Sequence, residues 1–196
     1  KWLRTLYCYP RFFTDELIDV FAQEEKVVKY VDIPLQHASN AVLRSMHRPD
    51  TKEKITELLA KLRDRIPGVV IRSTFIVGFP GETEEQYQEL KDFLQQQRFD
   101  HAGIFAYSRE EDTPAYSMEN QVAEEVKQNR YHDLKALQSM ISQENNEALE
   151  GEIADLQATV NDPKRIRKII TKELTDVKKK YAQPRRTDIV YEHMLE

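Results

Sequence analysis

Short apolar segments alternate with amphipathic segments along the first 120 residues of the chain. The apolar segments are rich in β-branched and aromatic residues and end at Pro, Gly or Ser, as covered strands do. The amphipathic segments carry apolar residues at helical spacing and have polar residues at their starts. The pattern predicts strands over residues 2–8, 28–34, 69–77 and 102–107. It predicts helices over residues 14–25, 39–47, 51–65 and 83–97.

The starts of the predicted helices carry capping signals. Thr14, Ser39 and Asp50 stand at three of these starts, and Thr83 with Gln86 has the spacing of a capping box. Strands and helices that alternate at this spacing imply parallel strands joined by right-handed crossovers. We therefore expect an α/β fold of about four βα units, either an open sheet or part of a barrel, followed by a helical tail.

The pattern changes after Asn120, where one long helix is predicted over residues 122–149 and continues over 152–160. Asp162 caps a new helix with Pro163 at its first position, and that helix runs to about Lys180, before Pro184. Basic residues outnumber acidic residues only after residue 151. We expect a partial barrel over residues 1–120, a helix closing it over 121–151, and a tail of foreign character over 152–196.

Composition narrows the classes of function. The chain has 196 residues, of which 40% are hydrophobic and 32% charged, and its formal net charge is -5. That charge argues against a surface that coats nucleic acid and makes DNA a poor expectation as a partner. A single cysteine, Cys8, permits no internal disulfide and fits a reducing cytoplasm. No apolar run approaches the length needed to span a membrane.

Polar groups follow several predicted strands, where parallel α/β folds hold their ligands. Gln36, His37 and Ser39 follow one strand, and Tyr107 ends another. The glycine-rich turn at Gly78 adds exposed backbone beside an aromatic ring, and this mixture suits an adenosine. Two of these residues can have a structural role in place of ligand binding. His37 can cap the following helix, and the Tyr107 ring can belong to the core. No catalytic dyad and no local metal motif is visible, so the catalytic residues stay unassigned.

Four segments in order carry a family resemblance. They are Tyr-Cys-Tyr-Pro at 7–10, Tyr-Val-Asp-Ile-Pro-Leu-Gln-His-Ala-Ser at 30–39, Arg-Ser-Thr-Phe-Ile-Val-Gly-Phe-Pro-Gly-Glu-Thr at 72–83, and Phe-Ala-Tyr-Ser-Arg-Glu-Glu-Asp-Thr-Pro-Ala at 105–115. Over residues 1–150 the chain resembles the radical S-adenosylmethionine methylthiotransferases. The resemblance is strongest to the RimO type, which modifies an aspartate of ribosomal protein uS12, and the related MiaB type modifies adenosine in tRNA.

The resemblance implies a fold, two cofactors and a set of cofactor-binding residues. The family has a partial barrel of six βα units, and this chain resembles the third to the sixth. It uses S-adenosylmethionine and [4Fe–4S] clusters, one of them held by a CxxxCxxC loop that this sequence lacks. We therefore expect a fragment that is inactive alone and has no metal ligands of its own. The residues that the resemblance places on the cofactor side are Gln36, Ser39, Arg72, Gly78, Phe79 and Tyr107.

The tail has a different resemblance. Residues 152–191 resemble the end of the coiled-coil region in the A subunit of bacterial type IIA topoisomerases, where such helices support a dimer gate. Two families joined near residue 151 indicate a chimera, a rearranged gene or an assembly artefact. Three functions stay open: an inactive enzyme fragment, a non-catalytic scaffold whose tail makes a helix–helix contact or a dimer, and a topoisomerase-like tail associated with DNA.

Overall fold

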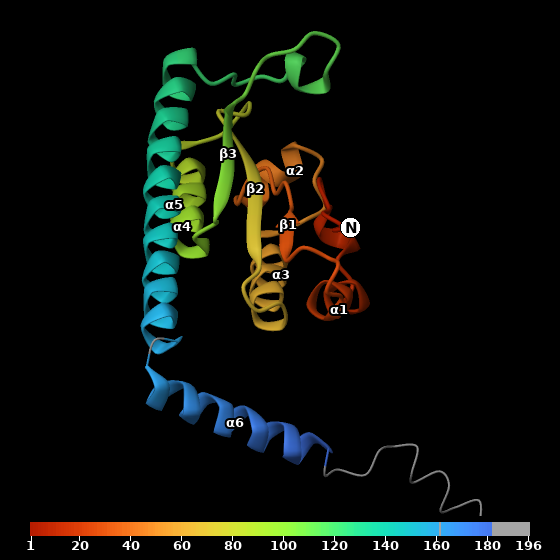
Figure 1. Cartoon of the computed structure of the whole chain (residues 1–196). Helices are drawn as coiled ribbons and strands as arrows, with labels where there is room; N and C mark the ends of the chain where they lie inside the picture. The colour runs from red at the N-terminus through yellow and green to blue at the C-terminus, as the bar shows by residue number, and fades with distance from the viewer. Residues whose placement is uncertain (161, 182–196) are drawn as a thin grey trace, which may run out of the picture. The chain divides into compact units, whose positions relative to one another are not determined.

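The computed structural model describes residues 1–160 and 162–181. The chain divides into two compact units, which are residues 1–145 and residues 146–196. The first unit holds the sheet and the helices that pack on it, and each unit is described by itself. The elements, labelled in Figure 1, are in chain order η1 (Pro10–Phe12), α1 (Asp15–Gln23), β1 (Tyr30–Asp32), α2 (Asn40–Ser45), α3 (Lys52–Arg65), β2 (Val70–Val77), α4 (Glu84–Gln97), β3 (His101–Ala106), η2 (Pro114–Ser117), α5 (Glu124–Val160) and α6 (Pro163–Tyr181).

The three strands form one parallel sheet in the order β1-β2-β3. Asp32 of β1 pairs with Arg72 of β2, and Val77 at the end of β2 pairs with Ala106 at the end of β3. The α/β class and the parallel strands are thus confirmed. Three strands are consistent with part of a barrel, and the described residues do not close a full one.

The strand predicted over residues 2–8 is wrong. This segment touches its neighbours through a parallel bridge between Leu3 and Val27 and a hydrogen bond from the Cys8 amide to the Asp32 carbonyl. Trp2 is 77% exposed, and Leu3 and Leu6 are more than half exposed. A strand is stabilised by side chains packed on its faces, and apolar side chains that face solvent cannot supply that packing.

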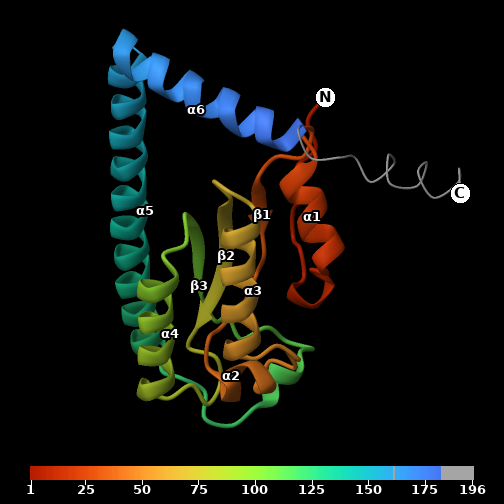
Figure 2. The ribbon, with the colours of Figure 1, turned by 90° about the horizontal axis from the view of Figure 1, so that it is seen from below.

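The two faces of β2 differ, as its strict alternation shows. Ile71, Phe75 and Val77 are fully buried on one face, whereas Arg72 and Ile76 on the other face are partly exposed. The buried face meets α3, α4 and α5 in a single hydrophobic core, and Phe75 lies against two further rings of that core. Figure 2 shows α3 and α4 running alongside the sheet. This packing leaves the other face and the carboxyl ends of the strands open for a ligand.

Most predicted helix starts are confirmed, with one correction. The Thr14 hydroxyl accepts a hydrogen bond from the Leu17 amide, and Thr83 forms the predicted capping box with Gln86. The sequence predicts Asp50 at the start of α3, but the residue that caps this helix is Thr51, whose hydroxyl accepts a hydrogen bond from the Lys54 amide. Asp50 and Thr51 both have side-chain acceptors, so the sequence allowed either register.

The second unit contains the last part of α5 and helix α6. The predicted start of α6 is confirmed, since Pro163 is its first residue and the Asp162 carboxylate accepts a hydrogen bond from the Lys164 amide at 2.9 Å. Helix α5 runs without a break through residue 151, and the predicted domain boundary there stays a prediction, as does the resemblance to topoisomerases. Pro184 and the last residues of that resemblance lie outside the described residues. No helix in the described part of the chain is long and apolar enough to cross a membrane.

Candidate cofactor-binding site

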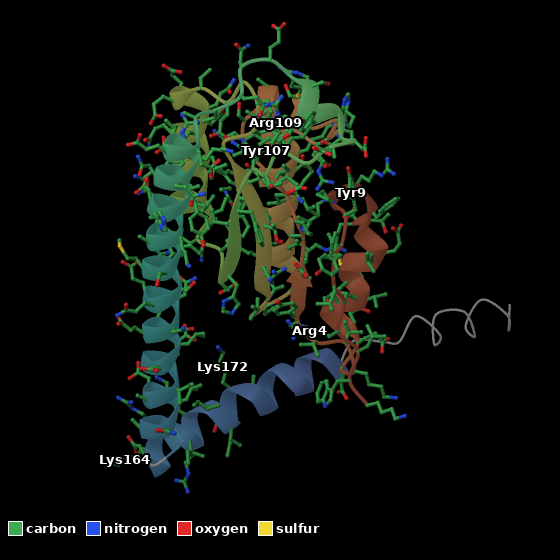
Figure 3. All side chains as sticks on the ribbon, turned by 90° about the horizontal axis from the view of Figure 1, so that it is seen from above. Arg4, Tyr9, Tyr107, Arg109, Lys164 and Lys172 are labelled. Carbon is green, nitrogen blue, oxygen red and sulfur yellow. The ribbon has the colours of Figure 1, made fainter. Side chains whose placement is uncertain are left out.

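A cavity of about 420 Å³ lies at the carboxyl ends of β2 and β3. This volume is within the range that small-molecule sites occupy. Figure 3 labels Tyr107, which directly follows β3, and Arg109 in the segment that leads on to η2. The cavity is lined by Gln36, Ser45, Met46, His47, Arg48, Ile76, Phe79, Tyr107, Thr113, Pro114, Ala115 and Met118.

Gln36 reaches this cavity from the segment after β1 through an unusual backbone conformation. Its φ is 74°, in the left-handed region that non-glycine residues rarely occupy. Two backbone hydrogen bonds tie it to β2, from its own amide to the Thr74 carbonyl and from the Ile76 amide to its carbonyl, both at 2.8 Å. Its side-chain oxygen Oε1 is buried and has no hydrogen-bond partner.

Tyr107, which directly follows β3, also lines this cavity. Its amide continues the pairing of β3 by donating to the Val77 carbonyl at 2.8 Å. Its ring meets the ring of Phe79 edge to face, with centroids 5.4 Å apart, and its hydroxyl is buried without a partner. Arg48 contributes a third such atom, Nε, although its Nη2 donates to the Pro34 carbonyl at 2.6 Å.

Three unpartnered polar atoms around one cavity indicate a polar ligand. A buried donor or acceptor that lacks a partner costs about 1–3 kcal/mol, and native proteins keep few of them. Amide, hydroxyl and guanidinium groups beside the Phe79 ring can bind a molecule that has both a flat face and hydrogen-bonding edges. The adenosine part of S-adenosylmethionine has both features, so the residues present fit it.

Gly78 begins the turn that follows β2, and the turn needs glycine there. Its φ is 72°, and a Cβ built on it would lie 2.2 Å from Cγ of Lys127. The Lys127 side chain cannot move away easily, because its Nζ donates to the Tyr107 carbonyl at 3.1 Å and pairs with Glu124 at 2.6 Å. Gly78 therefore lets α5 pack closely beside the two rings of the cavity.

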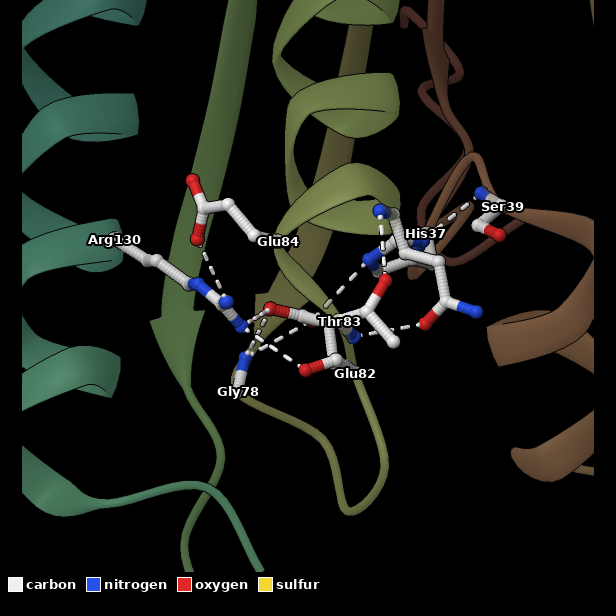
Figure 4. Close-up of polar contacts among 8 residues, drawn as sticks. His37, Ser39, Gly78, Glu82, Thr83, Glu84 and Arg130 are labelled. Carbon is white, nitrogen blue, oxygen red and sulfur yellow. Dashed lines mark hydrogen bonds and ion pairs between the residues drawn. The ribbon is translucent and has the colours of Figure 1, made fainter.

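The Glu82 carboxylate stabilises this turn and lies at the centre of a buried cluster. Its side chain is fully buried, and both carboxylate oxygens accept from the Gly78 amide at 3.0 Å. His37 contacts Glu82 at 3.2 Å, and Arg130 of α5 pairs with Glu82 at 2.7 Å. Figure 4 shows these contacts as dashed lines. Sequence reasoning missed Glu82 and Arg130, because their partners are brought together only by the fold.

The six residues that the family resemblance selected do not all meet. Gln36, Phe79 and Tyr107 line the cavity, and Gly78 precedes Phe79 in the turn. Ser39 is buried and does not line the cavity, and its amide donates to Nδ1 of His37 at 2.9 Å. Its assignment to the cofactor, like the others, stays a prediction.

Arg72 lies on β2 and does not line the cavity. Its guanidinium pairs with the buried Asp32 carboxylate at 2.8 Å across the strand register. The hydrogen bond to Asp32 raises the pKa of Arg72 above its ordinary value. This pair joins β1 to β2 on the open face of the sheet.

The chain does not fit an iron–sulfur cluster. A [4Fe–4S] cluster is held by cysteine thiolates, and Cys8 is the one cysteine in the sequence. Within residues 1–160 and 162–181, no three His, Cys, Asp or Glu side chains gather as a metal site would require. We therefore assign no chemical step to a cluster in this chain.

Comparison with known proteins shows which proteins the chain resembles. Residues 2–94 match the model of the Radical SAM superfamily. The chain is similar to a ribosomal protein uS12 methylthiotransferase RimO of Desulforamulus reducens, with 53% identity over 147 residues, which are 75% of this chain and 33% of that protein. A protein of the same name from Heliobacterium modesticaldum is 56% identical over 142 residues, which are 72% of this chain and 31% of that protein.

The fold also resembles a solved structure. Coproporphyrinogen III oxidase (HemN) from Escherichia coli, a radical SAM enzyme, superposes with a TM-score of 0.59 at 16% identity. The alignment covers 71% of this chain and 32% of the oxidase, and it supports the fold alone. This chain spans about one third of the length of the methylthiotransferases that it matches. The chain therefore contains a radical SAM domain, and its N-terminal three quarters are homologous to RimO-type methylthiotransferases.

Proposed function

We propose that residues 1–145 are the part of a uS12 methylthiotransferase that binds the adenosine moiety of S-adenosylmethionine. The observation that carries this proposal is the cavity at the ends of β2 and β3, with three unpartnered polar atoms beside the Phe79 ring. Identity above 50% to enzymes named for ribosomal protein uS12 supports that protein as the substrate and the cytoplasm as the location.

Each cavity residue has a distinct part in the proposed binding. The Gln36 oxygen accepts a hydrogen bond from an amino or hydroxyl group of adenosine, and the Tyr107 hydroxyl donates one or accepts one. The Phe79 ring, held edge-on by Tyr107, offers apolar contact to the adenine. When bound, S-adenosylmethionine supplies a methyl group and the source of an organic radical. The protein's own contribution at this site is to orient the nucleoside and to exclude water.

The proposal includes inactivity of this chain by itself. The thiolates that hold a cluster must come from polypeptide outside these 196 residues, because the sequence has one cysteine. After anaerobic reconstitution with iron and sulfide, we expect no deoxyadenosine from S-adenosylmethionine and reductant. Steady formation of that product would contradict this part of the proposal.

Binding without a cluster is the direct test. Titration with S-adenosylmethionine, followed by two-dimensional NMR of the full chain, should shift the amides around Gln36, Phe79 and Tyr107. Tyr107→Phe removes one hydrogen bond of about 1 kcal/mol and should weaken binding about fivefold.

Tyr131→Phe is the matched control for that titration. Tyr131 lies on α5 outside the cavity, and its hydroxyl accepts from Lys135. Its affinity for S-adenosylmethionine should equal that of the unaltered chain. Shifts spread over the surface, or equal losses in the two variants, would remove the cavity as the site.

The second unit supports another candidate function, which is self-association through the tail. Between residues 146 and 160, helix α5 carries four acidic side chains and none that is basic, whereas Lys164–Lys172 of α6 carry five basic side chains and none that is acidic. Both stretches also expose apolar side chains: Leu149, Ile153 and Leu156 at helical spacing on α5, and the adjacent Ile169 and Ile170 on α6. Opposite charge beside apolar stripes favours pairing of α5 of one copy with α6 of another.

Charge reversal tests this second function. The change Glu150→Lys with Asp155→Lys on α5 should turn a dimer into a monomer, and Lys168→Glu with Lys172→Glu on α6 should do the same. The chain that carries all four changes should dimerise again, because the charges are then opposite once more. Light scattering after size-exclusion chromatography measures each mass. A monomer in every case, or a dimer that is insensitive to the reversals, would eliminate this function.

A further inference from the structure

We propose that His37 is a positioning residue that holds the strained backbone of Gln36, so that the amide oxygen of Gln36 is presented at the cavity. The ligand named here rests on the proposed function, whereas the positioning itself concerns this chain alone. His37 lies next to Gln36, is fully buried and does not line the cavity. It therefore acts through its neighbour and not on a ligand.

The backbone of Gln36 requires an external restraint. A non-glycine residue with positive φ is strained, and this conformation persists only where the surroundings determine it. Such strain gathers at binding sites, and here the strained residue also carries a buried oxygen without a partner. Two backbone hydrogen bonds fix the residue to β2, from its amide to the Thr74 carbonyl and from the Ile76 amide to its carbonyl. We infer that the residues that follow Gln36 supply a further restraint.

His37 supplies this further restraint through both ring nitrogens. Nδ1 accepts a hydrogen bond from the Ser39 amide at 2.9 Å, so this nitrogen carries no proton in the neutral ring. The proton is then on Nε2, which donates it to the Glu82 carboxylate at 3.2 Å. One ring thus fixes its own short loop and ties that loop to the turn after β2. The assignment of the proton follows from these hydrogen bonds.

The anchor at Glu82 is itself rigid. The Gly78 amide donates to the carboxylate at the start of the turn, and the Arg130 guanidinium approaches it from α5. Glu82 and His37 have fully buried side chains, so water does not compete for these bonds. Figure 4 shows His37, Glu82 and Arg130 in one chain of contacts. The cluster consequently links three segments that are remote in sequence and transmits their rigidity to Gln36.

The first test needs no ligand. In His37→Asn the side chain can still accept from the Ser39 amide, but it is too short to reach Glu82. Gln36 should then leave the positive φ region, which NMR detects as loss of its strong intraresidue amide-to-Hα contact. His37→Gln, which is long enough to donate to Glu82, should retain that contact. Unchanged Gln36 signals in His37→Asn would overturn the proposal.

This test has a control variant and an alternative substitution. His132→Asn replaces an exposed histidine of α5 and should leave Gln36 unchanged. Should His37→Asn fail to fold, Ser39→Pro removes the amide that donates to His37, and the Ser39 φ of −74° suits proline. Ser39→Pro should release Gln36 as well, and a retained positive φ there would equally overturn the proposal.

The second test separates positioning from mere structural support. His37→Asn and Gln36→Ala should each weaken S-adenosylmethionine binding about fivefold to tenfold, and the double variant should bind no more weakly than Gln36→Ala. A positioning residue has nothing left to position once Gln36 is gone. Multiplied losses in the double variant would overturn the positioning role. No binding by the unaltered chain would refute the proposed ligand, while the ligand-free test would still decide the role of His37.

Discussion

Arg130→Met is expected to lower the free energy of unfolding of the first unit by about 3–5 kcal/mol. Arg130 is 7% exposed and donates to Glu82, whose side chain is fully buried. Removing the guanidinium leaves the Glu82 carboxylate with the Gly78 amide and His37 as its remaining partners. A buried charge without its counter-charge is strongly destabilising, whereas an exposed pair contributes little. Urea denaturation followed by circular dichroism measures the loss.

Arg98→Met is the matched control for this prediction. Arg98 pairs with Glu144 at 2.8 Å, but about half of each side chain is exposed. Water and salt screen such a pair, and its loss should cost no more than about 1 kcal/mol. In the double variant Arg130→Met with Glu82→Gln, part of the lost stability should return, because the unpaired charge is gone. Equal losses for Arg130→Met and Arg98→Met would show that the buried cluster is not held by charge.

Gly78→Ala is expected to lower the free energy of unfolding by about 2–5 kcal/mol. A positive φ costs an L-residue about 1–2 kcal/mol, and forcing a methyl group into a filled space costs about 1–3 kcal/mol more. The methyl group would meet the stem of Lys127, which is pinned at its far end by Tyr107 and Glu124. The same variant should displace Phe79 and weaken any ligand in the cavity.

Gly81→Ala separates the two causes. Gly81 has a similar φ of 82°, but nothing lies within 4 Å of a Cβ built on it. It should therefore show only the backbone part of the loss, about 1–2 kcal/mol. Thermal and urea unfolding of both variants give the comparison. A loss for Gly81→Ala as large as that for Gly78→Ala would contradict the close approach of Lys127.

The predictions that held are those with local causes. The β-branched and aromatic residues over 69–77 predict a strand, and the structure has β2 over Val70–Val77. The Thr83 and Gln86 capping box lies within four residues, so the chain needs no distant partner to form it. The parallel sheet followed from the order of strands and helices, since crossover connections have one preferred hand.

The prediction that failed depended on distant contacts. Residues 2–8 have the composition of a strand, yet Trp2, Leu3 and Leu6 lie largely exposed and the described chain gives the segment one bridge. Composition indicates that a segment forms a strand when other elements pack on its side chains, but it does not show whether such elements are present. The assignment of Asp50 as the cap of α3 was wrong for a different, local reason, because the adjacent Thr51 also has a side-chain acceptor.

The sequence by itself determined the parallel α/β class, the strand ends that carry Gln36 and Tyr107, and the glycine turn between them. Only the tertiary structure decided which of the six selected residues share a cavity, and it alone revealed the cluster beneath it. His37 and Glu82 are 45 residues apart, and Glu82 and Arg130 are 48 apart. Periodicity and capping act over a few residues, whereas a buried charge cluster is specified by three segments that meet only when the core has packed.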